Sequence, residues 1–156
     1  MTKELQTGDS APDFTLPRDG EGALSLADFG GRKLALYFYP KDDTSGCTAE
    51  AKDFSALAAD FAAAGADVVG VSPDPVKKHD KFRDKYELTF PLLSDESKVL
   101  LEAYGVWVEK SMYGRKYMGV ERSTFLIDAQ GRIARVWRKV KVTGHAQEVL
   151  AAAKAL

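Results

Sequence analysis

The sequence predicts an α/β fold with a central mixed β-sheet flanked by helices. Segments with the composition of buried strands alternate with segments of helical periodicity along most of the 156 residues. The order begins strand, helix, strand, helix, which is typical of a parallel sheet, and it ends with two strands and a closing helix. Since no repeat or Pro- and Ser-rich linker interrupts this order, we expect one domain over residues 1–156.

The best-defined elements are a strand and the helix that follows it. Residues 34–39 are continuously apolar and stop at Pro40, as expected of a central strand covered on both faces. A helix then begins near Cys47 and stops by Gly65, because glycine favours helix ends. Its apolar residues recur on one helix face, at Phe54, Leu57, Ala58 and Phe61.

The later elements follow from the same rules. One strand is short, apolar and ended by a proline, and two others flank a short turn containing glycine, which predicts an antiparallel hairpin. In chain order we expect a strand at residues 67–72, helices at 76–86 and 96–104, strands at 123–128 and 132–137, and a helix at 145–156.

One cysteine, Cys47, lies where the first buried strand gives way to a helix. In the first helical turn, unpaired backbone N–H groups and the positive end of the helix dipole favour a thiolate. Thr44 lies three residues earlier, and its hydroxyl can both donate and accept a hydrogen bond. A lone cysteine forms no disulfide within the chain, and with His79 and His145 it makes no recognisable zinc pattern. Cys47 is therefore either a small buried apolar residue or a reactive thiol.

Around this cysteine the sequence resembles the peroxiredoxins. Pro40, Thr44 and Cys47 reproduce the signature Pro-x-x-x-Thr-x-x-Cys of that family. Longer phrases resemble its Q-type (bacterioferritin comigratory protein) subfamily, at residues 11–14, 38–44, 46–48, 90–95 and 121–128. The resemblance implies a thioredoxin-like fold, with an N-terminal β-hairpin extension added to the central mixed sheet and its helices.

The resemblance also implies an activity, that of a thiol peroxidase acting on hydrogen peroxide and small organic hydroperoxides. The thiolate of Cys47 is then the peroxidatic nucleophile, which attacks one peroxide oxygen and becomes a sulfenic acid as water or an alcohol leaves. No metal or other cofactor takes part.

Five further residues receive roles from the same resemblance. Thr44 binds the peroxide, and Pro40 shields the thiolate from water. Arg122 is the cation beside the sulfur, where a permanent charge favours the thiolate and polarises the O–O bond. Two residues help to bind or orient the substrate, Glu50 and Gly46.

The sequence departs from the subfamily pattern at the second, resolving cysteine. Many Q-type relatives carry it five residues after the first or on the following helix, and Lys52 and Arg83 occupy these neighbourhoods here. The resemblance therefore implies a one-cysteine enzyme whose sulfenic acid is reduced by an external thiol, from thioredoxin, glutaredoxin or glutathione. The missing cysteine also allows an alternative function, a peroxide sensor that relays its oxidation to a partner protein. Ser45 replaces a proline common in this loop, with a small effect expected.

Each site residue also has a purely structural interpretation. Cys47 could be an inert buried thiol, Thr44 a helix N-cap, and Pro40 the end of a strand. Arg122 could pair with Glu121 or Asp128, and Glu50 could simply occupy a position that the helix dipole favours. We expect His79 and His145 on solvated helix faces without a role. Trp107 and the turn at residues 112–114 could line the approach of the substrate.

Charge and hydropathy exclude several other classes of function. The formal net charge is −1 with both signs interspersed, so a nucleic-acid partner is not expected. Residues 1–12 lack the apolar core of a signal peptide, and no window approaches the roughly 20 apolar residues that span a bilayer. We therefore expect a cytoplasmic protein without a membrane partner, and a monomer.

Overall fold

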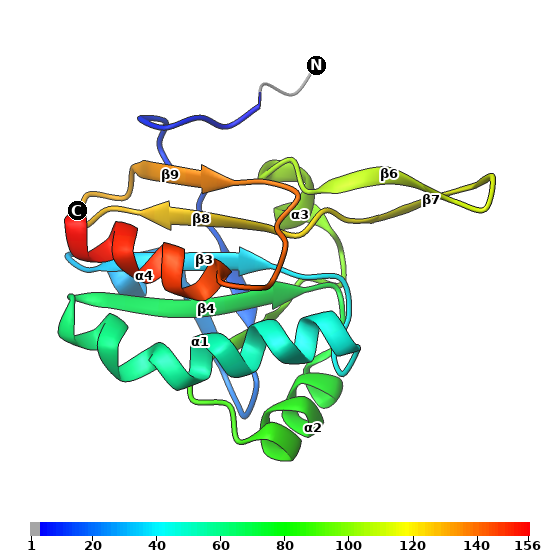
Figure 1. Cartoon of the computed structure of the whole chain (residues 1–156), viewed down its shortest axis with the longest axis horizontal. Helices are drawn as coiled ribbons and strands as arrows, with labels where there is room; N and C mark the ends of the chain where they lie inside the picture. The colour runs from blue at the N-terminus through cyan, green and yellow to red at the C-terminus, as the bar shows by residue number, and fades with distance from the viewer. Residues whose placement is uncertain (1–3) are drawn as a thin grey trace.

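A five-stranded mixed sheet forms the centre of the protein in the computed structural model, which describes residues 4–156 (Figure 1). In spatial order its strands are β5 (Leu92–Ser94), β4 (Ala66–Ser72), β3 (Lys33–Phe38), β8 (Ser123–Ile127) and β9 (Ile133–Trp137). The first three run parallel, and β8 is antiparallel to both β3 and β9. Residues 1–3 of the predicted domain lie outside the described residues.

Helices and the N-terminal segment cover the two faces of this sheet (Figure 1). One face carries α1 (Ser45–Ala63), α2 (Val76–Tyr86) and α4 (His145–Ala155). The other face carries α3 (Val99–Ala103), the 3-10 helix η1 (Leu26–Phe29) and a hairpin of β1 (Thr15–Pro17) and β2 (Ala23–Ser25). Within residues 4–156 no helix combines the length and the apolar character needed to cross a bilayer.

Strand β3 is apolar throughout because it contributes to two cores. Successive side chains of a strand point to opposite faces. Ala35, Tyr37 and the following Tyr39 pack against α1, α2 and α4. The intervening residues pack on the other face with α3: Leu34, Leu36 and Phe38. This double burial explains why the run lacks the polar alternation of a half-exposed strand.

The predicted fold is confirmed, including the N-terminal hairpin extension formed by β1 and β2. Helix α2 has the predicted bounds, and the antiparallel pair at the end of the sheet forms as expected. Helix α3 is shorter than the predicted range of 96–104. It begins at Val99 because Lys98 has a φ of 63°, a left-handed conformation that a helix cannot continue through.

A two-stranded ribbon projects from the sheet (Figure 1), and of this ribbon only the turn at residues 112–114 was expected from the sequence. Its strands are β6 (Trp107–Met112) and β7 (Arg115–Val120), and most of their side chains are exposed. Strands that bury little of their surface need no regular pattern of apolar residues, so hydrophobic periodicity does not predict them. The connection does have a recognisable cause. Tyr113 and Gly114 both have positive φ, at 52° and 77°, as a two-residue type I′ hairpin requires.

The expectation that two histidines lie on solvated helix faces is wrong. His79 is 0% exposed and His145 is 4% exposed. His79 shares the inner face of α2 with Phe82, three residues later, and His145 begins α4 next to the buried Ala146. Their polar atoms are satisfied by hydrogen bonds inside the protein, a condition that a helical pattern of apolar residues does not reveal.

Phe54 tests the packing that holds α1 on the sheet. Its ring is fully buried and stacks on Tyr37 at a centroid distance of 4.7 Å. The substitution Phe54→Ala leaves a cavity, and we expect the free energy of unfolding to fall by about 3–5 kcal/mol. Chemical denaturation followed by circular dichroism measures the change. Lys52→Ala, on the exposed face of the same helix, is the control and should stay within about 0.5 kcal/mol of the wild type.

Candidate active site

Cys47 lies in the first turn of α1, at the edge of the sheet where β3 ends. The loop from β3 brings the chain directly into this helix, so the sulfur faces the carboxyl end of the central strand. The side chain is only 1% exposed. Burial removes competing water from the sulfur and strengthens its interactions with neighbouring charged groups.

Arg122 reaches this sulfur from the neighbouring strand. The antiparallel register pairs Phe38 with Ser123, which places residue 122 beside the end of β3 and hence beside the start of α1. Arg122 Nη2 donates to Cys47 Sγ at 3.2 Å. A guanidinium donor at this distance stabilises negative charge on sulfur, both on the thiolate and on atoms that bind next to it.

Glu50 completes a buried polar triad with these two residues. It follows Cys47 by three positions, so both side chains lie on one face of α1. Its Oε1 accepts from Arg122 Nη1 at 2.6 Å, whereas Oε2 has no hydrogen-bond partner within residues 4–156. Burial raises the pKa of Glu50 from 4.5 to about 7, with the charge of Arg122 opposing the shift. The pairing with Glu121 or Asp128 considered above is not the one that Arg122 makes.

Gly46 makes room for the guanidinium. A Cβ atom at this position would lie 3.3 Å from Arg122 Nη2, closer than an ordinary van der Waals contact. The glycine therefore permits the approach of Arg122 to the helix start. The orienting role expected for Gly46 stays a prediction.

Thr44 and Pro40 lie in the loop between β3 and α1, as expected. Thr44 occupies the N-cap position, but its hydroxyl donates to the carbonyl oxygen of Lys41 at 3.0 Å and makes no capping bond within the described chain. Thr44 is exposed, and its hydroxyl retains its acceptor lone pairs. Pro40 is half-buried and ends the strand.

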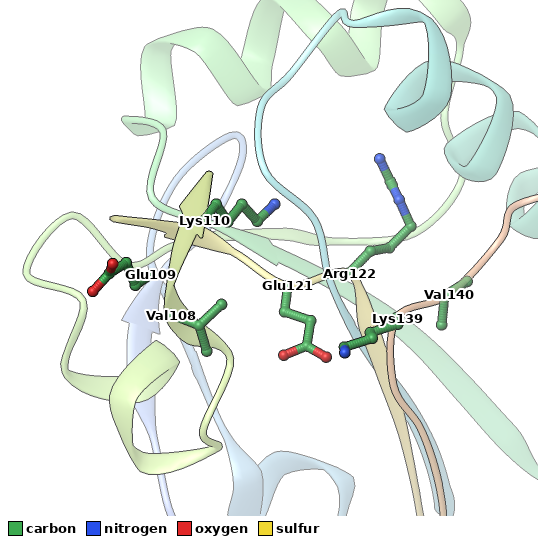
Figure 2. Close-up of a pocket in the computed structure, with 7 residues that line it drawn as sticks. All are labelled: Val108, Glu109, Lys110, Glu121, Arg122, Lys139 and Val140. Carbon is green, nitrogen blue, oxygen red and sulfur yellow. The ribbon is translucent and has the colours of Figure 1, made fainter. Parts of the chain in front are cut away.

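An open hollow of about 540 Å³ lies on the outer side of Arg122 (Figure 2). It is lined by Val108, Glu109, Lys110, Glu121, Arg122, Lys139 and Val140. Figure 2 shows the Arg122 side chain directed away from Glu121. Lys110 is half-buried on β6, and burial together with the charge of Arg122 lowers its pKa. The projecting ribbon thus contributes a cationic side chain near the site, which the sequence reasoning missed.

His145 is a second residue near the site whose position was not expected from the sequence. Its Nε2 lies 2.8 Å from Thr124 Oγ1, on the strand that begins directly after Arg122. Burial, followed by the charge of Arg122, lowers the pKa of His145 to about 4. The imidazole is therefore neutral at physiological pH and supports β8 without adding a second buried positive charge.

Comparisons with known proteins identify the family to which this chain is similar. The AhpC/TSA family model matches residues 7–136. A putative peroxiredoxin bcp of Coxiella burnetii is 52% identical over 146 residues, covering 94% of this chain and 97% of the relative. Peroxiredoxin Bcp of Bacillus subtilis is 48% identical over 146 residues, covering 94% and 93%. A solved structure of peroxiredoxin Q from Xanthomonas campestris has a TM-score of 0.89 and 48% identity, covering 97% of this chain and 96% of that one.

The thioredoxin-like fold and the close relatives define the chain as a thiol-dependent peroxidase, in which a buried cysteine and a half-buried arginine meet at a helix start. The chain belongs to the AhpC/TSA family, and within it to the Q-type peroxiredoxins that are also named Bcp. It has one cysteine. The family and the fold expected from the sequence are thereby confirmed.

Gly46→Ala tests the close approach of Arg122 to the helix. The added methyl group should displace the guanidinium by a few tenths of an ångström and slow the oxidation of Cys47 by hydrogen peroxide about 3–10-fold. Helix propensity favours alanine by about 1 kcal/mol, so stability should not fall with the rate. Stopped-flow oxidation and thermal unfolding separate the two effects. Ser45→Ala, at the exposed start of the same helix, is the control, and equal rates for all three proteins would contradict the assignment.

Glu50→Gln tests the buried carboxyl. Because the pKa of Glu50 in the folded protein is about 7, above its ordinary 4.5, folding favours the protonated form. The wild type should therefore lose stability relative to Glu50→Gln as pH rises from about 4.5 to 7, by about 1–3 kcal/mol, and stay level above that. Urea unfolding across this range measures the difference. A difference that is constant with pH would show that the carboxyl is not perturbed.

Proposed function

We propose that the chain reduces hydrogen peroxide and small organic hydroperoxides through Cys47, and that an external thiol restores the enzyme. The observation that carries this proposal is the contact of 3.2 Å from Arg122 to the sulfur, beside the carboxylate of Glu50. A hydroperoxide entering here meets a nucleophile and a cation already in place, without reorganisation of the surroundings.

In the first half-reaction, the Cys47 thiolate attacks one oxygen of the hydroperoxide as the O–O bond breaks. The leaving oxygen takes the electron pair, gains a proton and departs as water or an alcohol, and the sulfur becomes a sulfenic acid. We assign Arg122 to stabilise the leaving oxygen and Thr44 to hydrogen-bond the peroxide. Pro40 keeps water from the sulfur, Gly46 gives the guanidinium space, and Glu50 holds it.

In the second half-reaction, an external thiol attacks the oxidised sulfur and displaces water, forming a mixed disulfide. A second thiol then reduces this disulfide and returns Cys47 to the thiol. Thioredoxin, glutaredoxin and glutathione all supply the required chemistry. Neither a metal nor another cofactor enters this scheme.

The proposal places residues 1–156 in a single catalytic domain that acts as a monomer in the cytoplasm. Support for a monomer is that Cys47, Glu50 and Arg122 all come from one chain, so the site is complete without a second copy. Support for the cytoplasm is the need for reduced external thiols, which that compartment maintains. The balanced surface charge supports a protein that binds no nucleic acid.

Intact mass spectrometry tests the proposed first half-reaction. After about one equivalent of hydrogen peroxide, reduced protein should gain one oxygen at Cys47, and added thiol should reverse the gain. Cys47→Ser should show neither the mass gain nor peroxidase turnover. Peroxidase turnover retained by Cys47→Ser would overturn the proposal.

Two further measurements distinguish a recycled peroxidase from a sensor once Cys47 is oxidised. Turnover with glutathione, glutaredoxin or thioredoxin would support a peroxidase recycled by that thiol. The alternative, a sensor that relays oxidation, requires mixed disulfides between Cys47 and particular proteins in peroxide-treated cells. Its motive is the single cysteine of the chain, and trapping of no such disulfide would exclude it.

A further inference from the structure

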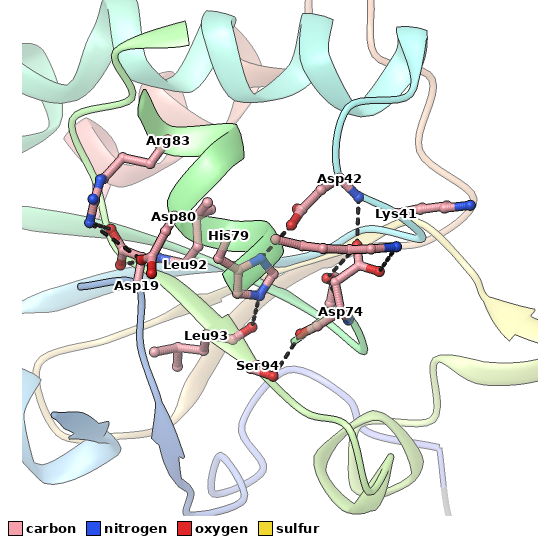
Figure 3. Close-up of polar contacts among 12 residues, drawn as sticks. Asp19, Lys41, Asp42, Asp74, His79, Asp80, Arg83, Leu92, Leu93 and Ser94 are labelled. Carbon is pink, nitrogen blue, oxygen red and sulfur yellow. Dashed lines mark hydrogen bonds and ion pairs between the residues drawn. The ribbon is translucent and has the colours of Figure 1, made fainter. Parts of the chain in front are cut away.

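The loop that carries the site residues is tied to α2 by a buried histidine (Figure 3). His79 Nδ1 lies 2.6 Å from Asp42 Oδ2, and His79 Nε2 lies 2.9 Å from the carbonyl oxygen of Leu93 on β5. The other oxygen of Asp42 accepts a hydrogen bond from the Tyr39 hydroxyl at 2.6 Å. Asp42 is 8% exposed and precedes Thr44 by two residues.

The backbone of the loop is held at the same point. The Asp42 N–H donates to Asp74 Oδ2 at 2.6 Å, and Ser94 donates to the Asp74 carbonyl oxygen at 2.6 Å (Figure 3). The next residue, Asp43, has a left-handed φ of 61°. A non-glycine residue adopts this conformation at an energetic cost, so the surrounding contacts must maintain it. Both the side chain and the main chain of the loop are therefore fixed just before the peroxide-binding segment.

The hydrogen bonds of His79 determine how many titratable protons His79 and Asp42 must hold together. Nε2 faces a carbonyl oxygen, which only accepts, so this nitrogen carries a proton. Nδ1 faces a carboxylate oxygen, so one more proton must lie between them, on either atom. If the pair loses one of these protons, two lone pairs face each other, either between Nδ1 and Asp42 Oδ2 or between Nε2 and the Leu93 carbonyl oxygen. The contact is thus attractive only while His79 and Asp42 together hold two protons.

The groups around His79 favour that state. Burial by itself lowers the pKa of the imidazole, but the hydrogen bond and charge of Asp42, then the Leu93 carbonyl and the charge of Asp74, raise it above the ordinary value. Three lysines of α2 lie on the outer side of this cluster. Lys78 lies 4.0 Å from Asp74, and Lys81 and Lys85 line a pocket together with Asp42. The contact is therefore fully present below about pH 6.5 and is lost as pH rises through the raised value.

We propose that His79 is a positioning residue for peroxide reduction, which fixes the loop bearing Thr44 and Cys47 through its two-proton contact with Asp42. This inference rests on the proposed peroxidase function. Its physical basis is that displacement of a reacting group by about 1 Å can cost about 100-fold in rate. His79 touches neither the substrate nor the sulfur, and it acts through the loop.

The first test removes the contact and keeps the volume. In His79→Phe, the ring remains but Asp42 loses its partner, and we expect peroxide oxidation of Cys47 to slow about 10–100-fold at pH 6.5. Stopped-flow kinetics measure the rate, and circular dichroism reports folding. Lys77→Ala, on the exposed face of α2, is the matched control. A folded His79→Phe protein that reacts within about twofold of the wild type would overturn the inference.

The second test keeps the hydrogen bonds and removes the shared proton. In Asp42→Asn, the amide oxygen can accept from Tyr39 and the amide N–H can donate to Nδ1 of a neutral imidazole. We expect this variant to react at least about tenfold faster than His79→Phe, a rescue that a mere loss of volume or charge does not predict.

The pH profile gives the deciding comparison, and it stands even if His79→Phe fails to fold. Both proteins keep Cys47, Glu50 and Arg122, so the ratio of wild-type to Asp42→Asn rates reports the contact with His79. We expect this ratio to fall several-fold as pH rises from about 6.5 through the raised pKa of His79, because only the wild type loses the two-proton contact. A constant ratio would overturn the inference. Absence of any oxidation in the wild type would instead overturn the peroxidase proposal.

Discussion

The rest of the site depends on the two contacts of the half-buried Arg122 guanidinium. It joins β8 to α1, and it contacts Cys47 and Glu50 at once. A buried charge is costly unless it is paired and hydrogen-bonded. The carboxylate of Glu50 offsets this cost for the arginine, and the arginine in turn is available to the sulfur. Strand β3 determines this arrangement, because its antiparallel pairing with β8 sets where residue 122 lies.

Much of this could be predicted from sequence because the determining signals are local. The apolar run of β3, the periodicity of α1 and the motif through Cys47 each reside in a few neighbouring residues. The contact between Arg122 and Cys47 spans 75 positions and followed only from resemblance to a family. Spacing alone would not have joined them, because register between distant strands is a property of the folded sheet.

The features that sequence reasoning missed are those whose signal is three-dimensional. The ribbon of β6 and β7 buries little, so its residues show no core-facing pattern. His79 and His145 looked like polar positions on helices, but each makes hydrogen bonds inside the protein. The role of Gly46 depends on a guanidinium from another strand. Burial of a polar residue becomes visible only when its partners are brought beside it.

Helix α2 also fastens the N-terminal hairpin region to the sheet. Arg83 pairs with the buried Asp19 at 3.1 Å, and Asp80 accepts from the Gly20 N–H at 2.6 Å. Arg83 lies in a neighbourhood where the resemblance to the Q-type subfamily would place a second cysteine. In this chain an ion pair therefore holds the helix at that point, and α2 connects the N-terminal region, the edge strand and the loop before Cys47.

The single thiol has a consequence for how the enzyme works in time. With one cysteine, the chain stores each oxidising equivalent at Cys47, and no second thiol within it can take that equivalent over. The lifetime of the oxidised protein is then set by collisions with thiols from outside. The turnover rate therefore depends on the concentration of external thiols as much as on the protein itself.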